Sequence, residues 1–123
     1  MDNAPEAPAS PATTDERIYQ VSLSLIPGIG DIIAKTLVSY CGSAGGVFRK
    51  TKSQLSKIPG IGEVNADNIL RFKDFSLAEA ELVKCERLGI KVLFYTDKEY
   101  PKRLKQAPDA PVVLYYRGSA SLN

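Results

Sequence analysis

The chain has 123 residues, 44% of them hydrophobic, which is enough for one domain with a core or for a small domain and a piece of another. With two cysteines and no histidine, it lacks the ligands of a usual four-ligand metal site and the commonest general base of enzymes. The net charge of +2 is uneven: residues 1–16 hold four acids and no base, whereas residues 17–73 hold eight bases and three acids. A polyanion is therefore expected to bind the second of these segments.

The sequence shows neither a secretory signal nor an apolar run of about 18 residues, the length that crosses a membrane. We therefore expect a cytoplasmic protein without a membrane partner. Cys41 and Cys85 are expected to be small buried hydrophobic residues, and no metal or other cofactor is predicted.

Residues 1–14 are rich in proline, alanine, serine and threonine, and they are predicted to form a disordered leader because they offer almost no apolar surface to bury. A first helix is predicted from Thr14 or Asp15 to about Ile26. Pro27 ends it, since the residue before a proline is pushed out of the helical region.

A second helix is predicted from Asp31 to a terminating Gly42. Residues 43–46, Ser-Ala-Gly-Gly, are read as a break, after which Val47 and Phe48 are expected to anchor a short connecting turn in the core.

A third helix is predicted to open at Thr51 or Ser53 and to run to Ile58, where a proline again follows. A fourth covers residues 63 to about 72, and a fifth runs from Ser76 to about 88. Ser76 and the glutamate three residues later form a capping-box pattern, and a glycine ends the helix. Residues 15–89 are therefore expected to form one helical domain.

The pattern changes after residue 89. Residues 90–95 and 112–116 are short, β-branched and aromatic, which is typical of strands. Between them, residues 100–105 can form a short helix with Pro101 at its first position. The connection of about fifteen residues is long enough for a parallel crossover. Residues 90–123 are therefore expected to be the truncated start of a larger α/β domain.

The most informative feature is a repeat: LIPGIG at residues 25–30 returns as KIPGIG at residues 57–62, and the similarity extends over about eighteen residues. The glycines permit a tight bend between two helices, and the isoleucine between them can turn inward. The unpaired amides of the bend and of the following helix can cradle a phosphate. The candidate DNA-binding residues are Gly28, Ile29, Gly30, Lys35, Gly60, Ile61, Gly62 and Arg71. A purely structural turn remains the alternative.

The two stretches LIPGIG-DIIAKTLVSY and KIPGIG-EVNADNILRF resemble the helix-hairpin-helix motif, and their duplication resembles the tandem domain. The resemblance implies a mainly α fold of about five helices whose hairpin amides bind the DNA backbone without reading sequence. One departure is that Asp31 and Glu63 follow the second glycine of each bend, where a carboxylate would repel a phosphate. Both residues can instead act as helix caps.

The tandem hairpins together with the segment that follows them, essentially residues 17–123, resemble the start of the DNA-processing protein A family. That family has a YP-x-x-L segment, a proline-containing loop and a P-P-x-x-L-Y-x-R-G strand. The matching stretches are 100–104 and 110–118, with Ala110 where a proline is common. The resemblance implies that a Rossmann-like domain begins here. It also implies a bacterial cytosolic protein of natural transformation and recombination that protects single-stranded DNA and delivers it to the recombinase RecA, with no small-molecule substrate.

Two other function classes are weighed. A base-excision glycosylase needs a well-placed catalytic aspartate, and Asp67 and Asp74 are badly placed for this role, so no catalytic residue and no enzyme activity are predicted. The alternative to DNA binding is a helical protein–protein interaction or architectural module without DNA affinity of its own.

Overall fold

The computed structural model describes residues 14–117. In chain order, this part of the protein contains α1 (Thr14–Leu25), α2 (Asp31–Cys41), α3 (Ala44–Phe48), α4 (Lys52–Ser56), α5 (Gly62–Arg71), α6 (Phe75–Leu88), β1 (Ile90–Phe94), α7 (Lys102–Lys105) and β2 (Val113–Arg117). Most of the predicted leader, residues 1–13, lies outside the described residues, while Thr14 already belongs to α1.

The first two helices follow the prediction. α1 ends at Leu25, two residues before Pro27, and α2 ends at Cys41. The C-cap of α2 is Gly42, whose φ of 90° is the left-handed conformation that glycine adopts without strain. The Gly42 amide donates to the carbonyl of Val38, which satisfies one of the last carbonyls of the helix.

The predicted break at residues 43–46 is wrong, because this segment begins a short helix, α3. Ser43 Oγ accepts from the Gly46 amide at 2.9 Å, and the Glu16 carboxylate of α1 accepts from the amides of Ala44 at 3.0 Å and Gly45 at 3.2 Å. These contacts satisfy the first amides of α3 and offset the poor helix propensity of two glycines. The helical domain therefore has six helices within the described residues, one more than expected.

The second pair of helices begins as expected with Thr51, which forms a capping box with Gln54. α6 differs from the prediction: it begins at Phe75 with Asp74 as its N-cap, so the predicted capping box of Ser76 does not form. Phe75 enters the helix because its ring packs edge-on against other aromatic rings at this corner. Gly89 ends the helix with a φ of 70°, as predicted.

The predicted parallel crossover is also wrong, because β1 and β2 pair antiparallel, with Ile90 opposite Arg117 and Phe94 opposite Val113. The connection folds back on itself instead of crossing over. The buried Tyr100 donates its hydroxyl to the carbonyl of Pro111 at 2.6 Å, which ties the connection to the start of the returning strand. Pro101 is the N-cap of α7 and not its first residue.

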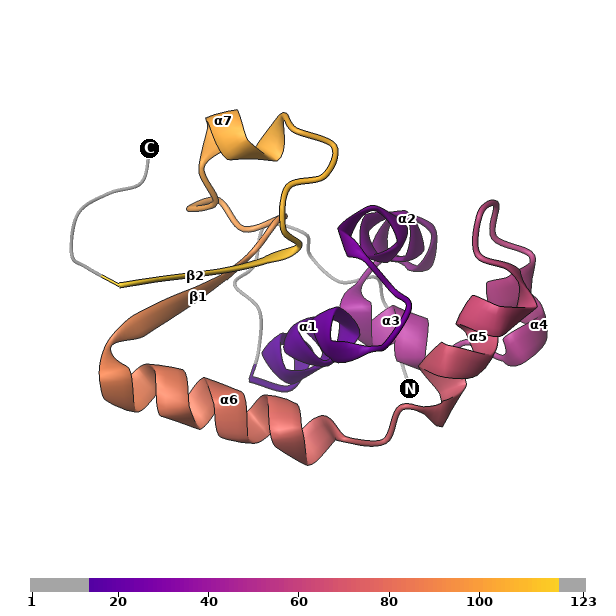
Figure 1. Ribbon diagram of the computed structural model, residues 1–123, viewed down its shortest axis with the longest axis horizontal. Helices are drawn as coiled ribbons and strands as arrows, with labels where there is room; N and C mark the ends of the chain where they lie inside the picture. Colours follow the sequence, from indigo (N-terminus) through magenta and orange to yellow (C-terminus); the bar gives the residue numbers. More distant parts are fainter. Residues whose placement is uncertain (1–13, 118–123) are drawn as a thin grey trace, which may run out of the picture.

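Figure 1 shows α1 near the middle of the molecule, with α6 along one side, the strand pair and α7 toward one end, and α4 and α5 at the other end. One hydrophobic cluster joins the helices to the strands, since Phe94 and Val112 belong to the same core as Val21, Leu37 and Leu55. Four rings, those of Tyr19, Phe48, Phe72 and Phe75, pack against one another beside this core.

The two cysteines differ from each other. Cys85 is buried, as predicted, whereas Cys41 is only partly buried, and burial raises the thiol pKa of both. Both are free thiols. Across residues 14–117, the helices are too short or too polar for any of them to span a bilayer.

Candidate nucleic-acid interface

The first glycine has the same backbone conformation in the two repeated bends. We call residues 26–30 the first bend and residues 58–62 the second bend. Gly28 has a φ of 84° and Gly60 a φ of 85°, so the first glycine of each bend needs the conformation that only glycine adopts freely. This confirms the predicted need for glycine at the first position of each bend, whereas Gly30 does not adopt a positive φ.

The isoleucine between the glycines is buried in both bends, with exposed fractions of 6% for Ile29 and 4% for Ile61. Its amide donates within the bend, from Ile29 to the Ile26 carbonyl at 3.2 Å and from Ile61 to the Ile58 carbonyl at 3.1 Å. These two amides therefore hold the bend closed, and the amides of the glycines and of the following helical turn are the better candidates for an anion.

The first bend lies against α5. A Cβ atom placed on Gly28 would be 3.0 Å from Asn68 Nδ2 and 3.7 Å from Asn65 Oδ1. Asn65 is held in turn, because its side-chain amide donates to the Ile61 carbonyl at 2.9 Å. Gly28 is thus flanked by the helix that follows the second bend, while Gly28 and Gly30 both remain exposed and Gly30 has no atom within 4 Å of a placed Cβ.

The helix after the first bend is attached to the C-terminal segment. Asp31 Oδ1 accepts from the Val112 amide at 3.0 Å, and Lys35 Nζ donates to the Pro108 carbonyl at 3.1 Å. Lys35 Nζ also lies 5.7 Å from the centre of the Tyr95 ring, a cation–π distance. The structure therefore places Lys35, a predicted DNA contact, against the protein itself. Asp31 bonds to a distant amide and does not cap α2 with its side chain.

Two tyrosines lie around this attachment. Burial raises the pKa of the Tyr95 phenol. Burial, and to a smaller extent the carboxylate of Asp31, raises the pKa of the Tyr100 phenol. Both phenols therefore stay neutral near pH 7, and Tyr100 keeps the proton that it donates to Pro111.

The second bend has open surroundings. No atom lies within 4 Å of a Cβ placed on Gly60 or on Gly62. Gly62 has a φ of 73°, whereas its counterpart Gly30 is at −84°, so the second glycine differs in conformation between the two bends. In Figure 1 the loop between α4 and α5 projects from the end of the molecule, away from the strands.

The charges near the second bend nearly cancel. Lys57 and Glu63 are both exposed on either side of it. Lys52 Nζ and Asp67 Oδ1 form an exposed ion pair at 3.1 Å. An anion at this bend would therefore depend on the backbone amides and the end of the α5 dipole more than on net positive charge.

The remaining predicted contact, Arg71, lies in the last turn of α5 and is exposed. A helix of ten residues is about 15 Å long, so Arg71 and the second bend are at opposite ends of α5. The structure does not bring Arg71 together with the bend residues.

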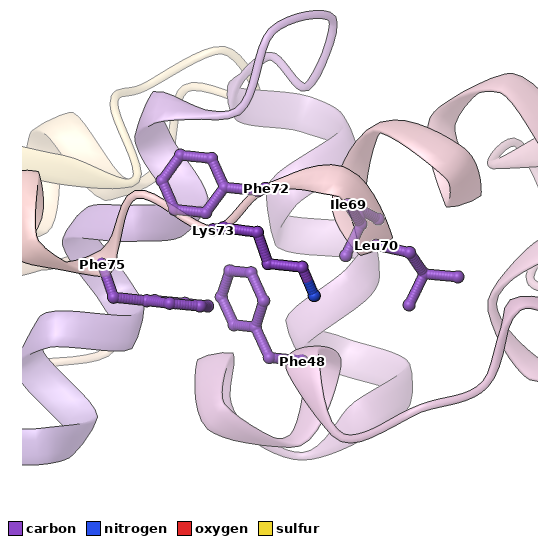
Figure 2. A pocket seen from close by; sticks show the side chains of 6 residues that line it. All are labelled: Phe48, Ile69, Leu70, Phe72, Lys73 and Phe75. Carbon is purple, nitrogen blue, oxygen red and sulfur yellow. The ribbon is translucent and has the colours of Figure 1, made fainter.

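The sequence prediction missed a small pocket at the far end of α5, shown in Figure 2. It has a volume of about 120 Å³ and is lined by Phe48, Ile69, Leu70, Phe72, Lys73 and Phe75. Pockets for small ligands usually enclose about 300–1,000 Å³, so this one is too small for a whole cofactor. The signal that could have found it is the group of three phenylalanines on three different segments.

No group of three or more metal-ligating side chains occurs among residues 14–117. The described part of the chain thus offers main-chain amides and exposed bases as its binding groups.

Comparison with known families agrees with this geometry. Residues 21–72 match the SAM-like helix-hairpin-helix tandem family, and residues 91–123 match the DNA recombination-mediator protein A family. No curated protein and no solved structure matches the chain.

The described fold and the first match define a tandem helix-hairpin-helix domain, which confirms the mainly α prediction. With the second match, the chain is similar to the N-terminal part of a DNA recombination-mediator protein A over two separate segments. It is thus related to proteins of DNA processing and recombination, and it carries motifs of a DNA-binding type.

Proposed function

We propose that this chain is a DNA-binding module in which the second bend, and not the first, holds a phosphate of the DNA backbone. The observation that carries the proposal is that both glycines of the second bend have open space around them, at the start of a ten-residue helix, whereas in the first bend only Gly30 has it and Gly28 faces Asn68. The amides of Gly60 and Gly62 and those of the first turn of α5 can donate to a phosphate oxygen without a side chain in the way. Such contacts bind DNA of any sequence.

The first bend has the same sequence but a different role in this proposal. Gly28 packs against Asn68, and both Asp31 and Lys35 bond to the C-terminal segment. We infer that the first bend joins the helical domain to residues 108–112. A carboxylate that is already bonded to an amide also keeps a phosphate away from this helix end.

In the full protein, we infer a role in protecting single-stranded DNA and in delivering it to the recombinase RecA during natural transformation, in the cytoplasm of a bacterium. The match of residues 91–123 to DNA recombination-mediator protein A supports this role. We also propose that the module has no catalytic activity of its own, as is general for these two families.

Exposed aliphatic residues favour the alternative of a protein-interaction module. Ile32 and Val64 occupy equivalent positions in the repeat, one residue after Asp31 and Glu63, and are 57% and 74% exposed. A partner protein could cover them. Salt separates the two functions, because DNA affinity falls steeply and linearly on a logarithmic salt scale, while an apolar interface shows little dependence.

The test of the main proposal is a titration of the isotope-labelled protein with a single-stranded oligonucleotide at low salt. We expect amide shifts at Gly60, Gly62 and Glu63 and none at Gly28 or Gly30. If the amide chemical shifts of the second bend do not change, the proposal is wrong.

A matched pair of variants separates binding from folding. Gly60→Ala and Gly42→Ala both place a side chain at a positive φ in open space. Each should lower stability by about 1–2 kcal/mol. Only Gly60→Ala should weaken DNA binding, and equal affinities of the two variants would show that Gly60 serves folding alone.

A further inference from the structure

The short helix α7 carries a concentration of positive charge that the helix-hairpin-helix function does not use. Three of its four residues are basic and exposed: Lys102, Arg103 and Lys105. With 3.6 residues per turn, these three side chains cover an arc of about 160°, and Leu104 points to the opposite side. Leu104 is half-buried, so the basic arc faces solvent.

The surroundings do not cancel this charge. Residues 98–109 contain four bases and two acids: Glu99, whose carboxylate is paired with Lys91 at 2.9 Å, and the exposed Asp109. The neighbouring Asp97 is paired with Arg17 of α1, also at 2.9 Å. Within residues 14–117, neither Arg103 nor Lys105 forms an ion pair. An excess of positive charge therefore remains at α7, in contrast to the nearly balanced second bend.

The backbone that carries the three basic side chains of α7 is held in place by buried contacts and hydrogen bonds. Tyr100, just before α7, is 1% exposed and bonds to the Pro111 carbonyl, and the Lys105 amide donates to the Pro101 carbonyl at 3.0 Å. Figure 1 shows α7 and the loop between α4 and α5 both projecting toward the upper side of the view, with α2 between them.

We propose that α7 is a second contact for the phosphate backbone of nucleic acid, with Arg103 and Lys105 as its main groups. The choice of nucleic acid as the ligand rests on the proposed function. The two contacts are complementary: the second bend supplies oriented amides with little net charge, and α7 supplies charge that attracts and holds the backbone. Arg103 can also bind one phosphate with two parallel hydrogen bonds.

The test measures how DNA affinity depends on salt in two matched double variants. Arg103→Gln/Lys105→Gln removes one arginine and one lysine from α7. Lys84→Gln/Arg87→Gln removes the same two residue types from the exposed face of α6, where glutamates surround them. All four positions are exposed, so both variants should keep the melting temperature of the parent.

Each neutralised phosphate of a single strand contributes about 0.7 to the slope of log affinity against log salt. The α7 variant should therefore lose about 1.4 from the magnitude of this slope with an oligothymidylate probe, and its affinity at low salt should fall. The α6 variant should keep the parent slope. Equal slopes for parent and α7 variant, or equal losses in both variants, would overturn the proposal.

The outcome is independent of the second bend. If the amides of residues 60–63 stay unmoved while the α7 variant loses slope, the phosphate site of the bend falls and the α7 contact stands. If the amides of residues 60–63 shift and the α7 variant keeps the parent slope, the phosphate site of the bend stands and the α7 contact falls.

Discussion

The first and second bends have the same five-residue sequence, Ile-Pro-Gly-Ile-Gly, yet the rest of the protein uses them differently. Gly28 of the first bend is exposed but faces Asn68 of α5, and the helix after this bend is bonded to Pro108 and Val112. A Cβ placed on either glycine of the second bend meets no atom within 4 Å, which in the first bend holds for Gly30 alone. A motif therefore specifies the shape of the turn, while contacts made by residues far away in the chain decide whether the turn is available to a ligand.

The largest effect that would test this difference is expected from the second glycine of each bend. Gly62→Ala places a side chain at a φ of 73° in front of the proposed phosphate, and Gly30→Ala places one at −84° in open space. Losing one hydrogen bond to a charged group costs about 1.5–3 kcal/mol, so DNA affinity should fall about 10-fold or more for Gly62→Ala. Gly30→Ala should bind like the parent, as measured by fluorescence anisotropy at low salt. A similar loss in Gly30→Ala would show that both bends bind DNA.

The next effect concerns stability. Asp31→Ala removes the acceptor of the Val112 amide, and we expect the free energy of unfolding to fall by about 1–2 kcal/mol. Glu63→Ala, at the equivalent position of the second bend, should change it by less than about 0.5 kcal/mol. Urea denaturation followed by circular dichroism measures both. Equal effects would contradict the joining role of the first bend.

A smaller effect is expected from the charge of the same two acids. Glu63→Gln removes a negative charge beside the proposed phosphate site, and at about 4 Å in water this charge is worth about 1 kcal/mol, so affinity should rise several-fold. Asp31→Asn should give no such gain, because its carboxylate is already bonded to the Val112 amide. Both affinities can be measured in the same titration at low salt. A gain in Asp31→Asn of the same size would indicate a phosphate at the first bend.

The smallest effect is expected from two lysines. Lys57→Gln, beside the second bend, should weaken DNA binding by about 2- to 3-fold and flatten its salt dependence slightly. Lys35→Gln should leave DNA binding unchanged and lower stability by about 0.5–1 kcal/mol through the lost contact with Tyr95. If Lys35→Gln weakened DNA binding more than Lys57→Gln, the assignment of the two bends would be reversed.

Local patterns predicted much of the helical fold. Pro27, Gly42, Thr51 and Gly89 act on residues within a few positions of themselves, and each ends or begins a helix where the sequence indicates. The inward isoleucines of the bends could be predicted for the same reason, since the two glycines that enclose them determine the turn.

The features that could not be predicted depend on distant contacts. α3 forms because Glu16, from α1, accepts from the amides of Ala44 and Gly45. The antiparallel pairing of β1 and β2 could not be predicted because a connection of this length also permits the parallel arrangement. Tandem glycines usually break a helix, and a long connection between strands often crosses over. Both predictions followed these average tendencies, and tertiary contacts override them in this protein.

The candidate site shows the same limit. The sequence indicates eight DNA-binding residues as one set, but the structure separates them. Gly60 and Gly62 are open, Lys35 faces the protein, and Arg71 lies at the other end of α5. The bond between Asp31 and Val112 joins residues 81 positions apart, and no repeat or spacing in the sequence reports it.

The two bonds from α2 to the C-terminal segment have a mechanical consequence. Asp31 and Lys35 are four residues apart, so they lie one above the other on the same side of the helix. A single bond would act as a pivot, whereas two bonds along one line leave α2 only a hinge motion about that line relative to residues 108–112. DNA bound at the second bend would then meet the C-terminal segment over a restricted range of angles.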